Sequence, residues 1–320
     1  LMVLEPIYEQ DFLDGSYGFR PGRSAHQALD ALWRGLMAMG GGWIIDLDIQ
    51  SFFDDVDWDH LRCFLDQRVR DGVIRRAKAK WLNAGVMESG EVSHPERGTP
   101  QGGVVSPLLS NLYLHEVLDV WFEHEVKPRL RGRAFEIRFA DDAALVFERE
   151  EDARRVLAVL SKRFAKYGLR LHPEKTRLVD FRSPPRREQG GSQRERSFAL
   201  LGFTHFWGRS RKGRWIVQRK TAKDRLTRAL RDIGSWCRAH RHWPVAAQQA
   251  ALRRKHKGHY AYYGITGKGR ALDRLLYEVR RLWRKWLHRR SWRGRMTWEK
   301  FVRLTERYPL PPPRVVHSVY

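Results

Sequence analysis

The order of hydrophobic periodicities between residues 43 and 181 constrains the fold of this chain more than any other feature. Helical spacing of apolar residues is clearest over 150–167, a segment that ends at Gly168. Strands are predicted from short alternating or apolar runs, over residues 43–49, 135–139, 143–147 and 176–181. The resulting order of strand, helices, strand, strand, helix, strand is typical of a split βαβ sheet. We therefore expect an α+β, ferredoxin-like domain whose helices cover one face of the sheet and leave the other face open.

Helix starts are marked by three side chains that can accept hydrogen bonds from the backbone. Ser24 is followed three residues later by Gln27, which is a capping-box pattern, and this helix should stop at the glycines that begin with Gly40. Asp57 or one of its neighbours is expected to cap the next helix. Ser106 is expected to cap a third, in which Pro107 takes the first helical position.

The second part of the chain is predicted to be mostly helical. Residues 183–197 are polar, contain Pro and Gly pairs, and predict a flexible connector, and residues 198–219 predict a hairpin. After residue 220 the pattern is helical to the end, with an apolar stripe formed by Leu272, Leu275, Leu276, Val279, Leu282, Trp283, Trp286 and Leu287. Arginines such as Arg280, Arg281 and Arg284 lie off this stripe, which indicates a small basic bundle.

The net charge points to a polyanionic partner. Lys and Arg number 61 against 37 Asp and Glu, so the formal net charge is +24. Residues 181–320 carry the whole excess, whereas residues 1–180 contain more acidic than basic residues. A surface of this kind suits nucleic acid first and an anionic membrane second. A merely solubilising role is the less favoured alternative for so uneven a distribution.

Cysteines and long apolar stretches exclude several classes of protein. Cys63 and Cys237 are the only two cysteines, so a zinc site made of cysteines alone is excluded. With no apolar stretch of about 18 residues, no transmembrane helix is expected. The chain also starts without a basic-then-apolar leader, so we expect a reducing, cytoplasmic location.

Three aspartates form the main candidate for chemistry. Asp48 ends the first predicted strand, and Asp141 and Asp142 form the tip between the next two. In a split βαβ sheet these strands are neighbours, so the acids can face one pocket. Carboxylates this close need a cation, and hard oxygen ligands favour Mg²⁺, of which two ions can activate the attacking oxygen and stabilise the leaving one. The alternative is that Asp141 and Asp142 only form a turn and bind no metal ion. We expect Asp142 to be the weaker ligand. Asp46 is either a charge behind the metal ligands or solvated, and solvation is the favoured alternative.

Several motifs together resemble the bacterial group II intron reverse transcriptase/maturase family. The motifs are Asp48-Ile49-Gln50-Ser51-Phe52-Phe53-Asp54, Gly98 to Leu108, Phe139-Ala140-Asp141-Asp142, Leu200-Leu201-Gly202-Phe203, and, ahead of these, Tyr17 to Ser24. The segments His259 to Gly264 and Trp298 to Pro313 are similar to the family's maturase region. The resemblance implies an RNA-directed DNA polymerase that also binds intron RNA and promotes splicing. Its partners would be group II intron RNA, an RNA template, a DNA primer and dNTPs, with no membrane.

The resemblance also implies roles for matching residues. Asp48 and Asp141 would bind two Mg²⁺ ions, with Asp142 beside them and the Ile49 carbonyl completing a metal shell. Phe53 would exclude a 2′-hydroxyl, although it could be a core residue instead. Gln101 and Gly102 would contact the incoming nucleotide. Lys175 would protonate the leaving pyrophosphate, although it could equally be a surface lysine. Contact with nucleic acid would be made by Arg20, Arg23, Arg280, Arg281 and Arg284. For Arg20 and Arg23, bracing of the fold remains an open alternative.

The resemblance further implies a domain plan and two departures from the family pattern. Residues 1–42 would be a remnant of the fingers, 43–182 the palm, 183–197 a connector, 198–219 a palm-to-thumb hairpin and 220–320 an all-helical thumb or maturase domain. Phe139 stands where many relatives have Tyr, so a hydroxyl near the primer end is absent. Relatives carry an N-terminal fingers segment with basic residues that clamp the triphosphate, and this sequence would start inside the motif that follows it. An RNA-binding maturase without polymerase activity is therefore the alternative interpretation.

Overall fold

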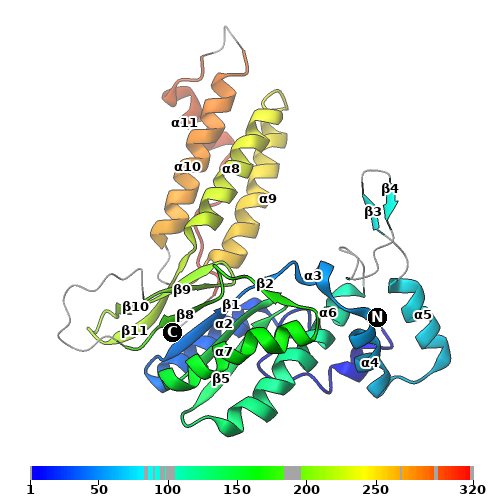
Figure 1. Ribbon diagram of the computed structural model, residues 1–320. Helices are drawn as coiled ribbons and strands as arrows, with labels where there is room; N and C mark the ends of the chain where they lie inside the picture. The colour runs from blue at the N-terminus through cyan, green and yellow to red at the C-terminus, as the bar shows by residue number, and fades with distance from the viewer. Residues whose placement is uncertain are drawn as a thin grey trace. The chain divides into compact units, whose positions relative to one another are not determined.

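The computed structural model describes residues 2–82, 86–88, 91–93, 98, 105–183, 196–266, 269–291 and 295–317 (Figure 1). The chain forms two compact units. The first comprises Leu1–Leu201 and His205–Gln218, and the second comprises Gly202–Thr204 and Arg219–Tyr320. The expected connector lies largely outside the described residues, because only 183, 196 and 197 of its positions are described.

A four-stranded antiparallel sheet forms the centre of the first unit. Its strands run in the order β5-β6-β1-β8, with bounds Ala134–Phe139, Asp142–Phe147, Trp43–Leu47 and Arg177–Asp180. Each neighbouring pair is antiparallel. The β5–β6 hairpin therefore lies beside β1, which is the neighbour relation that brings residues after β1 close to the hairpin tip.

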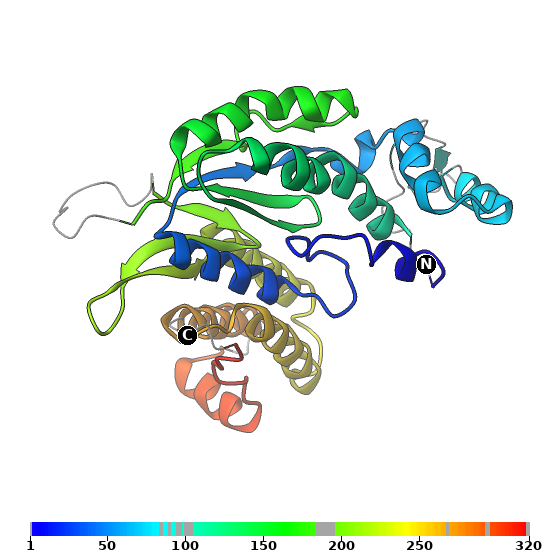
Figure 2. The ribbon, with the colours of Figure 1, turned by 90° about the horizontal axis from the view of Figure 1, so that it is seen from below.

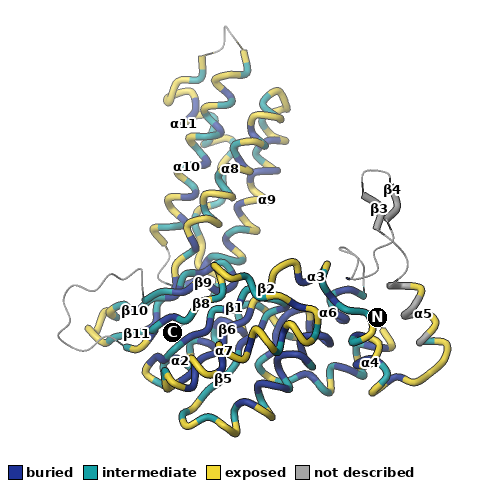
Figure 3. Tube along the Cα trace, in the orientation of Figure 1, coloured by how far each residue is buried: buried dark blue, intermediate teal, exposed yellow. Residues whose placement is uncertain are grey.

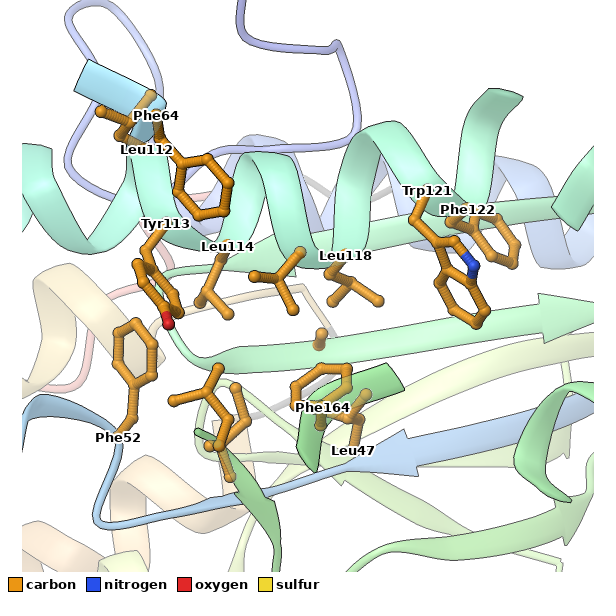
Figure 4. Packing of buried hydrophobic residues seen from close by; sticks show 14 of the residues in the cluster. Leu47, Phe52, Phe64, Leu112, Tyr113, Leu114, Leu118, Trp121, Phe122 and Phe164 are labelled. Atoms are coloured by element: carbon orange, nitrogen blue, oxygen red, sulfur yellow. The ribbon is translucent and has the colours of Figure 1, made fainter. Parts of the chain in front are cut away.

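Helices pack one face of this sheet into a large apolar core. Helix α6 (Ser106–Leu114) continues through the π-helical segments η1 (His115–Asp119) and η2 (Trp121–Val126) into the short 3-10 turn η3 (Lys127–Arg129), and α7 (Glu150–Lys166) lies beside it. Figure 4 shows Leu114, Leu118 and Trp121 pointing from this helix toward the sheet, where Leu47 and Phe164 meet them. Alternation along β1 explains the packing, because Ile45 and Leu47 face these helices.

A further helix contacts the opposite face, which corrects the expectation that this face stays open. Helix α2 (Ala25–Met39) packs against β5, and a Cβ added at Gly35 would lie 2.4 Å from the ring of Phe135. Figure 2 shows α2 and α7 on opposite sides of the strands. Phe135 alternates with Glu136 along β5, so its side chain leaves the sheet on the side away from the α6–α7 core. The contact of Gly35 with Phe135 lies toward the end of β5 that is farther from the Ala140–Asp141 tip.

Shorter elements make up the rest of the secondary structure before residue 222. The short helices are α1 (Glu5–Tyr8), α3 (Phe52–Asp55), α4 (Trp58–Arg68) and α5 (Gly72–Leu82). Two small antiparallel strand pairs are also present, β2 (Ile49–Gln50) with β7 (Arg170–Leu171) and β3 (Val86–Glu88) with β4 (Glu91–Ser93). A three-stranded sheet has the order β11-β10-β9, with bounds Trp215–Thr221, Phe203–Arg209 and Phe198–Leu200. The predicted hairpin is thus present, and its turn contains Gly213 at φ +75°.

Two of the three predicted helix caps are confirmed. The Ser24 side chain accepts from the Gln27 N–H at 3.3 Å, and Asp57 Oδ1 accepts from the Asp59 and His60 N–H groups. The expectation for Ser106 is wrong, since α6 begins at Ser106 itself and its N-cap is Val105. The Val105 backbone already has helical angles, so the helix starts one residue earlier than the capping pattern predicts.

The second unit contains four helices, α8 (Lys223–Ala239), α9 (Val245–Tyr263), α10 (Gly269–His288) and α11 (Trp298–Arg307). Buried and exposed residues alternate along them in the pattern of a helix bundle (Figure 3). The predicted stripe of α10 is buried at Leu272, Leu275, Val279, Trp283 and Leu287. Trp286 is only partly buried. Among the described residues, no helix is long and apolar enough to cross a membrane.

Candidate active site

The strand register brings the predicted acids to one end of the sheet. Leu47 pairs with Ala143 across β1 and β6, so the next residues along, Asp48 and Asp142, follow opposite one another at the same sheet end. Phe139 pairs with Asp142 across the hairpin, which leaves Ala140 and Asp141 as its two-residue tip. Residues far apart in sequence are therefore neighbours at the end of β1.

Alternation along the strands decides which face these acids occupy. Ile45, Leu47 and Ala143 belong to the core beneath the helices, so Asp46 and Asp142 lie on the opposite face. Asp48 continues the same alternation. The site is therefore a cluster of carboxylates at the strand ends, outside the apolar core.

Asp46 is not solvated, contrary to the expectation from sequence. Its side chain is 18% exposed, and one carboxylate oxygen lies 3.3 Å from Arg177 Nε. Burial raises the pKa of the Asp46 carboxyl to about 6, although Arg177 acts in the opposite direction, and the charges of Asp142 and Asp48 raise the pKa further. Asp46 and Arg177 face each other because they pair in register across β1 and β8.

The segment after β7 is fastened to Asp48. The His172 N–H donates to the Asp48 carbonyl at 2.9 Å, and the Thr176 hydroxyl donates to the same carbonyl at 3.2 Å. Lys175 lies between them in sequence, and its Nζ is 3.4 Å from Asp48 Oδ1. The structure therefore places Lys175, one of the predicted site residues, beside a predicted metal ligand.

A buried arginine that sequence reasoning missed supports the hairpin tip. The Arg138 side chain is fully buried and forms a bidentate pair with Asp119, with both distances 2.6 Å. It also donates to Asn111 Oδ1 at 3.1 Å, to Ser16 Oγ at 2.8 Å and to the Ala140 carbonyl at 3.0 Å. The signal was available in the sequence, because alternation puts Arg138 on the core face of β5.

A segment near the N-terminus adds to the edge of the sheet next to this tip. The Tyr17 N–H donates to the Arg138 carbonyl, and the Arg138 N–H donates to the Gly15 carbonyl, both at 2.8 Å. A Cβ added at Gly18 would lie 2.2 Å from the Ala140 nitrogen. Only glycine allows this close approach, so the segment is held directly against the residue before Asp141.

Arg20 is hydrogen-bonded within this segment, as the bracing alternative from the sequence expects. Its side chain is 4% exposed and pairs with Glu9 at 2.7 Å. The remaining N–H groups donate to the carbonyls of Leu13, Ser16 and Phe12. Every guanidinium donor is engaged within the protein, which favours the bracing alternative, and contact of Arg20 with nucleic acid stays a prediction. Arg23 is more exposed and pairs with Asp14 at 2.8 Å.

The other predicted site residues fall into three groups. Phe53 is partly buried against the core, whereas its neighbour Phe52 is the buried residue, and the two rings lie 5.4 Å apart. Ile49 is buried and pairs with Leu171 across β2 and β7. Gln101 and Gly102 lie outside the described residues.

The three α10 arginines that the sequence predicts to contact nucleic acid have unlike surroundings. Arg281 is exposed and lies 3.4 Å from Glu278. Arg280 donates to the Thr305 hydroxyl at 3.2 Å. Arg284 donates to the Met296 carbonyl at 3.0 Å and stacks 4.1 Å from the Trp298 ring centroid. Arg280 and Arg284 thus tie α10 to α11 and the segment before it, while Arg281 faces solvent.

The donor set fits a hard cation only when a ligand completes it. In the described part of the chain, no three Asp, Glu, His or Cys side chains stand close enough to hold a metal ion by themselves. Asp48 and Asp142 supply oxygen atoms at one strand end, which suits Mg²⁺ that takes further oxygens from bound phosphate. Lys175 and Arg177 balance part of the negative charge of this cluster.

Comparisons with known proteins show what this chain is similar to. The family model described as "Reverse transcriptase (RNA-dependent DNA polymerase)" matches residues 1–205. The chain is 36% identical over 173 residues to the group II intron-encoded protein LtrA of Lactococcus lactis subsp. cremoris, which covers 51% of this chain and 28% of that relative. It is 30% identical over 171 residues to the nuclear intron maturase 2, mitochondrial, of Arabidopsis thaliana, covering 41% of this chain and 23% of that relative. The chain thus spans less than a third of the length of these relatives.

A solved structure shares the fold. The apo telomerase from Candida tropicalis aligns with a TM-score of 0.50 and 12% identity, covering 91% of this chain and 54% of that chain. A likeness at this level of identity concerns the fold alone. It agrees with the mixed helix-and-sheet architecture described above.

Proposed function

The chain belongs to the reverse transcriptase (RNA-dependent DNA polymerase) family, and from this premise we propose that it copies RNA into DNA as the polymerase of a group II intron. We further propose that it binds the intron RNA and promotes its splicing. The resemblance to group II intron reverse transcriptases, predicted from the motifs, is confirmed by the match to LtrA. The activity and the partners rest on the arguments that follow.

One observation carries the proposal. The pairing of Leu47 with Ala143 brings Asp48 next to the Asp141-Asp142 tip, at an end of the sheet that is outside the core. Carboxylates so arranged can hold two divalent ions, which when bound would activate the primer 3′-hydroxyl and neutralise the leaving pyrophosphate. Asp48, Asp141 and Asp142 are the proposed side-chain ligands. The Ile49 carbonyl is the proposed backbone ligand.

Other residues of the chain supply positioning and a proton. Lys175, 3.4 Å from Asp48, is placed to contact the triphosphate and to protonate the leaving pyrophosphate as a general acid. Phe53 is the proposed barrier to a 2′-hydroxyl. Gln101 and Gly102 are proposed to contact the incoming nucleotide and the template, on the strength of the motif alone.

The architecture supports a polymerase palm followed by a thumb. The antiparallel order β5-β6-β1-β8 is consistent with a ferredoxin-like palm over residues 43–182, and residues 1–42 would belong to the fingers. The helices after residue 220 would be the thumb or maturase domain, reached through the connector 183–197 and the hairpin 198–219. Their excess of Lys and Arg would hold RNA through its phosphates.

Primer extension tests the proposal directly. The full chain should extend oligo(dT) on poly(rA) in the presence of Mg²⁺, and Asp141→Ala should abolish synthesis while RNA binding persists. Asp59→Asn is the matched control, because Asp59 is an exposed carboxylate on α4, 92% accessible, and should leave synthesis unchanged. Substantial synthesis by a folded Asp141→Ala protein would refute the site. RNA binding without synthesis by the unaltered chain would favour the maturase alternative.

A further inference from the structure

Phe19 combines exposure with an unfavourable backbone conformation. Its side chain is 55% exposed, and its φ is +54°. A bulky residue in this left-handed region is an outlier, because its Cβ crowds the following carbonyl. More than half of Phe19 is exposed, so packing in the core does not explain a phenylalanine at this position. Its positive φ is also unfavourable for a bulky residue, so local backbone preference does not explain it either.

The surroundings of Phe19 hold this conformation in place. On one side, the Arg20 guanidinium is fixed by hydrogen bonds to Glu9 and three backbone carbonyls. On the other side, Gly18 abuts the Ala140 nitrogen, and its carbonyl accepts a hydrogen bond from Asn111. Strained residues that persist in such an over-determined frame cluster at functional sites.

The position of the ring indicates which site it serves. The Phe19 ring centroid lies 6.3 Å from that of Phe139, at a tilt of 42°. Phe139 pairs with Asp142, so both share the carboxylate face of the sheet. The two rings therefore form an apolar ledge beside the Asp141 tip, with Phe19 as its solvent-facing part.

We propose that Phe19 is a substrate-positioning residue whose ring contacts the terminal base pair of the primer–template duplex. This inference rests on the proposed function, because a reacting 3′-oxygen held at the aspartates brings the last base pair to this ledge. A base or sugar can cover an exposed ring without any sequence preference, which suits a polymerase. The strained backbone then aims the ring at the duplex end.

The test uses two variants of the full chain. Phe19→Asn removes the ring and introduces a residue that tolerates positive φ, so its melting temperature should be equal to or higher than that of the unaltered chain. Phe19→Tyr keeps the ring and should keep function. Val159→Ala on α7 is the control, because Val159 is 47% exposed on the helices that cover the opposite face of the sheet.

Two readouts separate this inference from the proposed function. The dissociation constant for a labelled RNA template–DNA primer duplex is measured without nucleotide, and kcat/KM for the duplex is measured by extension. Phe19→Asn should raise the dissociation constant or lower kcat/KM about 5- to 100-fold, the effect of removing one stacked base from an aromatic ring. If the unaltered chain binds the duplex without extending it, the proposed function fails and the dissociation constants alone decide the role of Phe19.

Two outcomes would overturn the inference. Unchanged duplex binding and unchanged extension by a folded Phe19→Asn protein would show that the ring touches no substrate. A lowered melting temperature for Phe19→Asn, accompanied by equal losses for Phe19→Tyr, would show that the residue is structural. Retained function in Phe19→Tyr together with a stable but impaired Phe19→Asn is the result expected.

Discussion

The buried guanidinium of Arg138 donates a hydrogen bond of 3.0 Å to the carbonyl of Ala140, the residue immediately before Asp141. Ala140 has φ +56° and is the first residue of the tight turn at the hairpin tip. Its carbonyl accepts this hydrogen bond from the core side of the sheet. Arg138 is itself fixed by Asp119 at 2.6 Å. A carboxylate at the tip is thus positioned by a buried ion pair that touches no substrate.

Removing this support should separate stability from activity. Arg138→Met leaves the buried Asp119 carboxylate without its partner, which should cost about 3–5 kcal/mol in the free energy of unfolding. The double variant Arg138→Met/Asp119→Leu should recover much of that stability, because neither member of the ion pair is left buried without its partner. DNA synthesis should stay low in both, since the Ala140 carbonyl no longer has its donor.

Urea unfolding and primer extension measure the two effects separately. The interaction energy from the double-mutant cycle gives the coupling of Arg138 to Asp119. Full recovery of both stability and synthesis in the double variant would show that the hydrogen bond to Ala140 does not position the tip.

Much of the fold could be predicted because strands and helices leave local periodic signals. Alternation in residues 43–49 indicated the face on which Asp48 lies, and the strand order then placed it beside Asp141. The Arg138 network was missed because its partners Asp119, Asn111 and Ser16 are 19, 27 and 122 residues away. Alternation along β5 indicates that Arg138 faces the core, but no local pattern shows which distant residues it pairs with.

Errors in the prediction have a common physical origin in tertiary contacts. From its position in the strand, Asp46 is expected to be solvated. In the structure it pairs with Arg177, which lies opposite it on the neighbouring strand β8. The predicted apolar stripe of α10 is wider than the buried face of the helix. Trp283 is fully buried and hydrogen-bonded to Gln248 at 2.9 Å. Trp286, in contrast, contacts the cationic side chains of Arg238, Lys285 and Arg289. A helical wheel cannot tell the centre of a bundle face from its margin.

Truncation at Phe53 should admit ribonucleotides. The Phe53 ring is only partly buried, so Phe53→Val opens space at the surface of the core and should cost less stability than the same change at the buried Phe52. The measurement is the ratio of kcat/KM for dNTP over rNTP, which should fall. Phe52→Leu is the matched control, and it should lower stability without changing the ratio. An unchanged ratio for Phe53→Val would leave Phe53 as a core residue.

Acid should destabilise the second unit through buried histidines. Burial, together with the smaller effect of the neighbouring His259, lowers the pKa of His256 from an ordinary value of 6.5 to about 4. Burial likewise lowers the pKa of His259 to about 4. Below pH 6.5 the unfolded chain binds protons that the folded chain excludes, so stability is full above pH 6.5 and falls toward pH 4.

The slope of this pH dependence gives the number of histidines involved. Each one contributes about 1.4 kcal/mol per pH unit in this window. His256→Gln should lower the overall stability, because it removes the hydrogen bond of 3.0 Å between Nδ1 and the Tyr260 hydroxyl, and should reduce the slope by one proton. Melting followed by tryptophan fluorescence between pH 4.5 and 7.5 measures both. An identical slope in the variant would show that His256 titrates normally.

The dependence of RNA affinity on salt should identify the residues that hold phosphates. Arg253, Arg254 and Lys257 are exposed on α9, and Arg281 is exposed on α10. Each neutralised phosphate releases counterions, so the log–log slope should change by roughly 0.7 to 0.9 for every phosphate that a variant no longer binds. Reversing the three α9 charges in the full chain should therefore flatten the slope by about 2 without lowering the melting temperature.

Charge reversal at Arg280 or Arg284 of α10 should have a different result. Arg284 stacks on Trp298 and Arg280 bonds Thr305, so Glu at either position should loosen α11 and lower the melting temperature. Trp283→Ala should cost more stability, about 3–5 kcal/mol, because that ring is fully buried, whereas Trp286→Ala should cost less. Equal salt slopes for the unaltered chain and the α9 variant would show that RNA binds elsewhere. In that case Arg281→Glu alone becomes the test of the α10 face, since it is the one arginine of the three that changes charge without disturbing α11 or the segment before it.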